Sequence, residues 1–123
     1  MQYVLLVGIG GALGAMARYC INQLVVIYLG SFLLGTFIVN ISGSFILGLL
    51  MGLLSSHPTL STEARIFMSV GFLGSYTTFS TLSVATVQSL QKGDIATAAI
   101  NIGASVLLGL TAALAGLMLG RTI

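Results

Sequence analysis

Four long apolar stretches fill most of this sequence, and they constrain its fold more than any other feature. Charged side chains are correspondingly rare: Lys, Arg, Asp and Glu make up 5% of the 123 residues, whereas about a quarter of a soluble domain is charged. So few charges cannot cover the surface of a folded chain in water. The composition therefore predicts a multi-pass protein of the cell membrane.

The lengths of the apolar stretches predict four transmembrane helices. A helix needs about 20 residues to cross the hydrocarbon core, whereas membrane-spanning strands would show alternation over about 10 residues, which this chain lacks. We therefore expect an all-α membrane protein with a single four-helix domain over residues 1–123. The expected helices cover residues 3–20, 32–54, 66–91 and 95–119.

Short connections separate these helices. Pro58 follows the second stretch, and either Ser61 or Thr62 is suited to cap the N-terminus of the third helix. Residues 92–94, with a central glycine, make a tight turn before the fourth helix. Such connections leave no room for a soluble or catalytic domain, so we expect no enzyme activity and a function that lies among the helices.

Several other functions lack support in the sequence. Cys20 is the only cysteine, so the chain has no internal disulfide, and nothing matches the paired ligand spacing of a zinc or redox site. His57 lies in a connection without acidic, Cys or His neighbours, so we expect it to be solvated. The basic residues are dispersed along the chain, which argues against nucleic-acid binding.

The distribution of basic residues predicts an unusual membrane orientation. With four crossings, Arg65 and Arg121 fall on the side of the two termini, while Arg18, at the expected end of the first helix, and Lys92 fall on the other. An excess of Lys and Arg orients a chain in the membrane, and here no excess exists. Dual topology, with two inverted copies forming an antiparallel dimer, follows as a hypothesis. Four small helices also enclose too little space for an aqueous pathway on their own.

Pairs of glycines with four-residue spacing predict close helix packing. In lipid, small residues at this spacing let two helix backbones approach each other. This pattern indicates packing and carries little information about function. The pairs are Gly10 and Gly14, Gly48 and Gly52, and Gly116 and Gly120.

The third stretch holds the most informative polar residues. Six hydroxyl groups lie between Ser75 and Thr81, counting Tyr76, and two glycines, Gly71 and Gly74, precede them. Ser and Thr can bond to the carbonyl one turn back, but that accounts for only one or two such residues. A cluster of six predicts a distorted or broken helix whose freed backbone groups face protein or water.

Polar residues on two other helices extend this pattern. Thr97, Asn101 and Ser105 are spaced by four on the fourth helix and so share one face, and Asn40 and Ser44 are spaced by four on the second. Each of the two asparagines, taken alone, is also compatible with an interhelical clamp. Together, however, these residues provide a track of neutral hydrogen-bond donors.

No carboxylate accompanies these donors at membrane depth, because Glu63 and Asp94 both lie at helix ends. Proton-coupled exporters need a titratable residue in the membrane, so passive conduction is the simpler interpretation. Stripping water from an anion costs tens of kcal/mol in an idealised estimate, and closely spaced donors must replace that hydration. Phe79 adds a positively polarised ring edge. The sequence therefore favours a passive pathway for a small anion.

Motifs in three of the helices resemble a known family, the Fluc/CrcB fluoride channels. The third-helix motif is the most specific of them, and the order of the motifs agrees with the family along all four helices. The matching segments are Gly10-Gly11-Ala12-Leu13-Gly14-Ala15 with Arg18-Tyr19, Gly35-Thr36-Phe37-Ile38-Val39-Asn40, Gly71-Phe72-Leu73-Gly74 and Thr77-Thr78-Phe79-Ser80-Thr81.

The resemblance implies a fold and a function. It implies a dual-topology dimer with two pores that exports fluoride passively from the cytoplasm and so relieves fluoride toxicity. By position, it implies that Asn40 faces a pore, that Ser80 and Thr81 belong to a polar track, and that Ser105 is the partner of that track on the fourth helix.

The resemblance also implies a structural cation and a charged pore mouth. Backbone carbonyls of Gly74 and Thr77 would bind a central Na⁺ in the dimer. Arg18 would supply positive potential at the mouth of the pore, a role that electrostatic focusing makes reasonable.

One position departs from the family pattern. A second phenylalanine usually follows the first by three residues, and Leu82 occupies that place. Because leucine has no polarised ring edge, a heterodimer in which a paralogous subunit supplies the aromatic stays open as an alternative. Two further alternatives are a non-transporting assembly subunit and a small dual-topology exporter of cationic drugs, although the membrane-embedded glutamate expected of such an exporter is absent.

Overall fold

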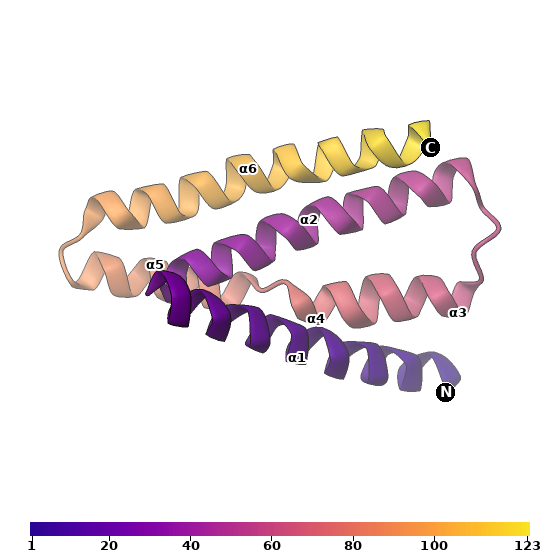
Figure 1. Ribbon diagram of the computed structural model, residues 1–123, viewed down its shortest axis with the longest axis horizontal. Coiled ribbons are helices and arrows are strands. Elements are labelled where there is room, and N and C mark those ends of the chain that lie inside the picture. Colours follow the sequence, from indigo (N-terminus) through magenta and orange to yellow (C-terminus); the bar gives the residue numbers. More distant parts are fainter.

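Figure 1 shows the computed structural model of the chain, which describes residues 1–123 and consists of helices without strands. The prediction of an all-α protein is therefore confirmed. The elements, in chain order, are α1 (Gln2–Leu29), α2 (Phe32–Ser56), α3 (Thr62–Arg65), the π-helix η1 (Ile66–Leu73), α4 (Gly74–Tyr76), α5 (Phe79–Gln91) and α6 (Ile95–Thr122).

Three of these helices, α1, α2 and α6, are long and apolar enough to cross a membrane. The pieces from α3 to α5 follow one another as a fourth segment, which begins at the end of the molecule that holds both termini and finishes at the opposite end (Figure 1). The fourth segment is helical throughout except at a short interruption. The chain is thus a multi-pass membrane protein.

Local side-chain caps set several helix ends. Gly30, in the left-handed conformation with φ 70°, ends α1, and the Ser31 hydroxyl accepts a hydrogen bond from Leu34 N at 3.1 Å to begin α2. Ser61 rather than Thr62 caps α3, because its hydroxyl accepts from Ala64 N at 3.2 Å. Asp94 caps α6 after the predicted tight turn.

The first helix differs from the predicted range of residues 3–20, because α1 continues to Leu29. Arg18 consequently lies inside the helix, and its expected position at the helix end is corrected. The physical reason is that Asn22 and Gln23 interrupt the apolar pattern without breaking the hydrogen-bonded backbone, which ends only at Gly30. Asn22 is buried within the protein instead of marking a polar connection.

The glycine pairs pack the helices together, as their spacing predicts. Side chains placed at Gly48 and Gly116 would meet the backbone oxygens of Ala113 and Phe45 at 2.3 and 2.2 Å, so α2 and α6 lie in backbone contact. A side chain at Gly14 would similarly meet Phe72 O at 2.1 Å, which places α1 directly against η1. The α2–α6 seam and the α1–η1 contact together hold the broken segment in place.

Candidate functional site

The interruption of the fourth segment is the centre of the candidate site. Helix α4 ends at Tyr76, Thr77 and Thr78 are extended with ψ values of 155° and 122°, and α5 begins at Phe79. Leu73 O accepts from both Thr77 N at 3.1 Å and Thr77 Oγ1 at 3.0 Å, so the last turn before the break is closed. The break predicted from the six clustered hydroxyls is therefore present in this segment.

Thr78 begins the second half of the segment. Its Oγ1 accepts from Thr81 N at 3.2 Å, which is the hydrogen bond of an N-cap. The same hydroxyl lies 3.2 Å from Ser80 Oγ and 3.2 Å from Thr81 Oγ1. Three of the clustered hydroxyls thus form one short hydrogen-bonded group at the start of α5.

The side chain of Asn40, on α2, binds the backbone of the break. Its Oδ1 accepts from Thr78 N at 2.8 Å, and its Nδ2 donates to Thr78 O at 3.0 Å. Both groups of Thr78 that the helix would otherwise pair are satisfied in this way. Asn40 therefore acts as a clamp between α2 and the break, and it also lines the cavity described below.

Two backbone carbonyls at the break are released from the usual helical pairing. Thr78 N, which a continuous helix would direct to Gly74 O, donates to Asn40 Oδ1 instead. Thr81 N, which a continuous helix would direct to Thr77 O, donates to Thr78 Oγ1. Carbonyl oxygens of this kind are ligands for hard cations such as Na⁺.

Arg18 lies close to the same break. Its Nε donates to Ser75 O at 3.1 Å across the contact between α1 and α4, and the side chain is partly buried. It also lines a cavity of about 340 Å³ beside α1, together with Tyr19 and Asn22. The guanidinium group is therefore near the break rather than at a helix terminus.

A cavity of about 240 Å³ opens beside the break between α2 and α5. Asn40, Phe79 and Leu82 all line it, so the structure brings these three predicted site residues together. Their environments differ, because Phe79 is 75% exposed whereas Leu82 is 6% exposed. Ser80 and Thr81 line a different cavity, of about 260 Å³, on another side of α5.

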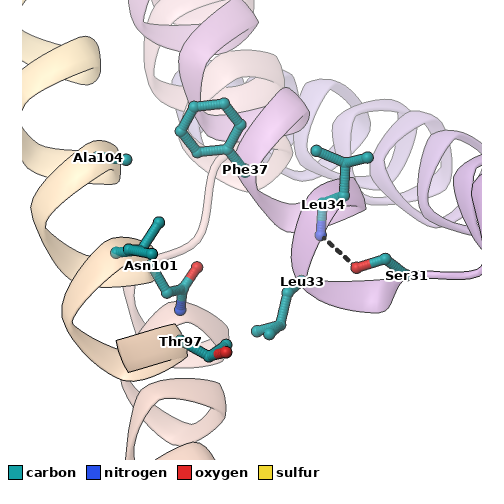
Figure 2. A pocket seen from close by; sticks show the side chains of 8 residues that line it. Ser31, Leu33, Leu34, Phe37, Thr97, Asn101 and Ala104 are labelled. Atoms are coloured by element: carbon teal, nitrogen blue, oxygen red, sulfur yellow. Dashed lines mark hydrogen bonds between the residues drawn. The ribbon is translucent and has the colours of Figure 1, made fainter. Parts of the chain in front are cut away.

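The polar face of α6 lies apart from the break. Figure 2 shows Thr97 and Asn101 facing Leu33 and Phe37 of α2 across a pocket of about 350 Å³. Asn101 Nδ2 donates to Thr86 Oγ1 of α5 at 3.1 Å, so this asparagine links two helices. The predicted sharing of one face by Thr97 and Asn101 is therefore confirmed.

Ser105 continues this face but does not line the cavities at the break. It is 8% exposed, and its Oγ has no hydrogen-bond partner. Two further buried polar atoms share this property, Asn22 Oδ1 and Thr36 Oγ1, and sequence reasoning did not single them out. The signal that could have found them is a polar residue within an apolar helix, as at Asn22 in α1 and Thr36 in α2.

The carboxyl of Asp94, at the start of α6, has a displaced pKa. A hydrogen bond from the Thr97 side chain and another from its backbone N–H lower the pKa of this carboxyl. The two distances are 2.6 and 3.1 Å. Asp94 caps α6 at one end of the molecule and Glu63 lies in the first turn of α3, so no carboxylate lies at the break.

Comparison with known proteins gives a consistent set of similarities. Residues 5–117 match the family described as "CrcB-like protein, Camphor Resistance (CrcB)". A protein of Hydrogenovibrio crunogenus named fluoride-specific ion channel FluC is 49% identical over 94% of this chain and 88% of its own length. Proteins of the same name from Acidobacterium capsulatum (41% identical, 100% of this chain and 98% of the relative) and Pyrococcus abyssi (44%, 98% and 98%) are similar over nearly their full lengths.

Proposed function

This chain belongs to the CrcB family of fluoride channels, and we propose that it conducts fluoride passively along the polar surface beside the helix break. It is an ion-transporting membrane protein and not an enzyme. The observation that carries the proposed route is the gathering of Asn40, Phe79 and Leu82 around one cavity next to the break. The pathway, the dimer and the bound cation described below are parts of this proposal.

The chemistry of the break suits a small anion. The hydroxyls of Ser80 and Thr81 each lie 3.2 Å from the Thr78 hydroxyl, and the three supply neutral donors without an opposing negative charge. Such donors replace the hydration that fluoride loses, and Phe79 presents a polarised ring edge beside them. Ser105 of α6 does not line the cavities at the break, but its buried hydroxyl has no partner within the chain and would supply a donor to an ion that passes along α6.

A second copy of the chain would complete the pathway. The 75% exposure of Phe79 supports this, because an aromatic ring at a polar break needs a covering surface. Both termini lie at one end of the molecule (Figure 1), which fits four crossings per chain. An inverted second copy would then place two breaks side by side around a two-fold axis in the membrane plane.

The carbonyls of Gly74 and Thr77 would hold a structural Na⁺ where the two breaks meet. Their fit rests on the loss of helical partners at both positions. Each chain supplies two such oxygens, and a second copy would double that number toward the six or so that hard cations of this size accept. When bound, the cation supplies positive charge that fixes the carbonyls of the two breaks against each other.

Fluoride efflux from liposomes that contain only this chain is the direct test. A fluoride electrode should record rapid release after the membrane potential is dissipated, whereas chloride-loaded liposomes should release little. Absence of flux from monodisperse protein would contradict a homodimeric channel. Restoration of flux by a paralogous subunit with phenylalanine at the position of Leu82 would then support the heterodimer.

Membrane orientation provides a separate test of the dimer. Terminal reporter tags should be found on both faces of the membrane, because the Lys and Arg residues do not favour one side. Two lysines added to the connection between α2 and α3 should impose one orientation and abolish flux of the chain expressed alone. A single orientation of the unmodified chain would contradict the antiparallel homodimer.

A further inference from the structure

A continuous groove follows one face of α5 away from the break. The cavity lined by Ser80 and Thr81 and a second cavity of about 310 Å³ share Phe32, Ala85 and Gln88 as lining residues. Because the two cavities share walls, they form one groove between α5 and the start of α2. It extends from Ser80 and Thr81 at the break to Lys92. The end of α5 and the start of α2 lie at the same end of the molecule (Figure 1).

Polar side chains line this groove at helical spacing. Thr81, Gln88 and Lys92 follow one another at intervals of seven and four residues and therefore lie on one side of α5. Ser89 also lines the outer cavity and is 9% exposed, so a polar side chain is buried against the groove. The groove therefore offers hydrogen-bond donors at its two ends, hydroxyls at the break and an amide and an ammonium group at the outer end, with an apolar stretch between them.

The outer end of the groove carries a positive charge, that of Lys92, which no neighbouring carboxylate neutralises. Lys92 lines the outer cavity, and Asp94, the nearest acidic residue in the sequence, directs both carboxylate oxygens to Thr97 of α6. The N-terminus of α2, which begins at Phe32, adds the positive end of a helix dipole beside the same cavity. The outer cavity is consequently suited to attract an anion.

We propose that this groove, which we call the α5 groove and define by Thr81, Gln88, Ser89 and Lys92, is an entrance through which fluoride reaches the break. Lys92 attracts the anion from solution, and the Gln88 amide orients it toward the hydroxyls of Thr81 and Ser80. This inference rests on the proposed fluoride conduction and assigns to Lys92 and Gln88 a role outside the break itself.

The variant Lys92→Gln tests the attraction. At about 10 mM ionic strength, the fluoride concentration that gives half-maximal flux should rise about threefold, while the maximal rate stays within about twofold, because the charge acts on encounter rather than on passage through the break. The difference should largely disappear at about 0.3 M salt, where charges are screened over a few ångströms. Lys92 also lies at the C-terminus of α5, so thermal stability is measured in parallel to detect a merely structural effect.

Arg121→Gln is the matched control, because it removes one positive charge at the opposite end of the chain. In an antiparallel dimer each membrane face carries both ends, so the two variants change the surface charge of a face equally. Arg121→Gln should leave the half-saturating concentration unchanged. An equal effect of both variants would overturn the proposal, since it would indicate a general surface potential.

Gln88 gives a test that depends on the sign of the charge. Gln88→Glu should raise the half-saturating concentration about tenfold, whereas Gln88→Lys should restore Lys92→Gln to nearly unmodified behaviour, because it places a cation one turn further along the groove. If the double variant Lys92→Gln with Gln88→Lys were as impaired as Lys92→Gln alone, that result would also overturn the proposal. Failure of the unmodified chain to conduct would remove the proposed function, while conduction indifferent to Lys92 and Gln88 would remove only the α5 groove.

Discussion

The seam between α2 and α6 and the break between α4 and α5 satisfy the polar groups of a membrane-buried backbone in opposite ways. In the seam, Gly48 and Gly116 bring two unbroken helices so close that an added Cβ would lie 2.3 or 2.2 Å from a backbone oxygen. All backbone polar groups there stay paired within each helix. At the break, the backbone N–H and C=O of Thr78 have no helical partners, and the Asn40 side chain binds both of them.

This difference teaches that the two regions depend on each other. An extended, polar backbone inside a membrane is tolerated only where protein surrounds it. The seam holds α2 rigidly, and α2 in turn presents Asn40 to Thr78. The close packing of α2 against α6 thus supports the interrupted backbone beside it.

Disruption of the close packing between α2 and α6 should have the largest effect. Gly116→Ala would force α2 and α6 apart, because the new Cβ would lie 2.2 Å from Phe45 O and neither atom belongs to a flexible side chain. We expect a loss of about 3 kcal/mol or more and little monodisperse protein on size exclusion. Gly103→Ala, on the same helix, meets nothing within 4 Å and should be at least as stable as the unmodified chain. Equal behaviour of the two variants would contradict the tight seam.

Removal of the clamp at the break should have the next largest effect. Asn40→Ala leaves Thr78 N–H and C=O without partners, at a cost of about 1–3 kcal/mol. We expect fluoride flux to fall more than tenfold while the dimer survives on size exclusion. Ser55→Ala, which removes a hydrogen bond to Gly52 O on the same helix, should keep full flux. Full flux from folded Asn40→Ala would exclude Asn40 from the ion path and leave it a helix clamp.

The two cavity-lining residues Phe79 and Leu82 should respond differently from each other. Phe79→Ile should abolish or strongly reduce flux with little loss of stability, because the ring is 75% exposed in the single chain. Leu82→Phe should keep or raise flux in a homodimer, at a cost of up to about 1–3 kcal/mol, since the site is buried but borders a cavity of about 240 Å³. Normal flux after both positions are made aliphatic would show that the hydroxyl groups alone suffice.

The smallest effect concerns the helix cap at the start of α6. Hydrogen bonds from Thr97 lower the pKa of Asp94, so the carboxylate stabilises the folded chain at neutral pH, and this contribution is lost as the pH falls through the lowered pKa. Asp94→Asn, which keeps a good cap, should weaken the acid dependence of thermal unfolding and leave fluoride flux at neutral pH unchanged. An acid dependence identical in both proteins would contradict this role.

Much of the architecture could be predicted from local patterns. The scarcity of charge predicts a membrane protein, the glycine spacing predicts close helix packing, and the hydroxyl cluster with Gly71 and Gly74 predicts the break. Ser61 is one of the two expected caps, and its side chain caps α3. These features depend on overall composition or on residues within one or two helical turns of each other, so they can be recognised in the sequence directly.

Other features were decided only by contacts between distant segments. Asn40 and Thr78 are 38 residues apart, and Arg18 and Ser75 are 57 apart, so no local pattern indicates either hydrogen bond. Phe79 and Leu82, only three residues apart, differ in exposure, 75% against 6%, and their spacing does not indicate this difference. The sequence by itself determined that this chain lies in a membrane with a polar interruption; the packing of α1 and α2 decided which backbone groups there are paired and which stay free, because burial depends on neighbours that the local sequence does not specify.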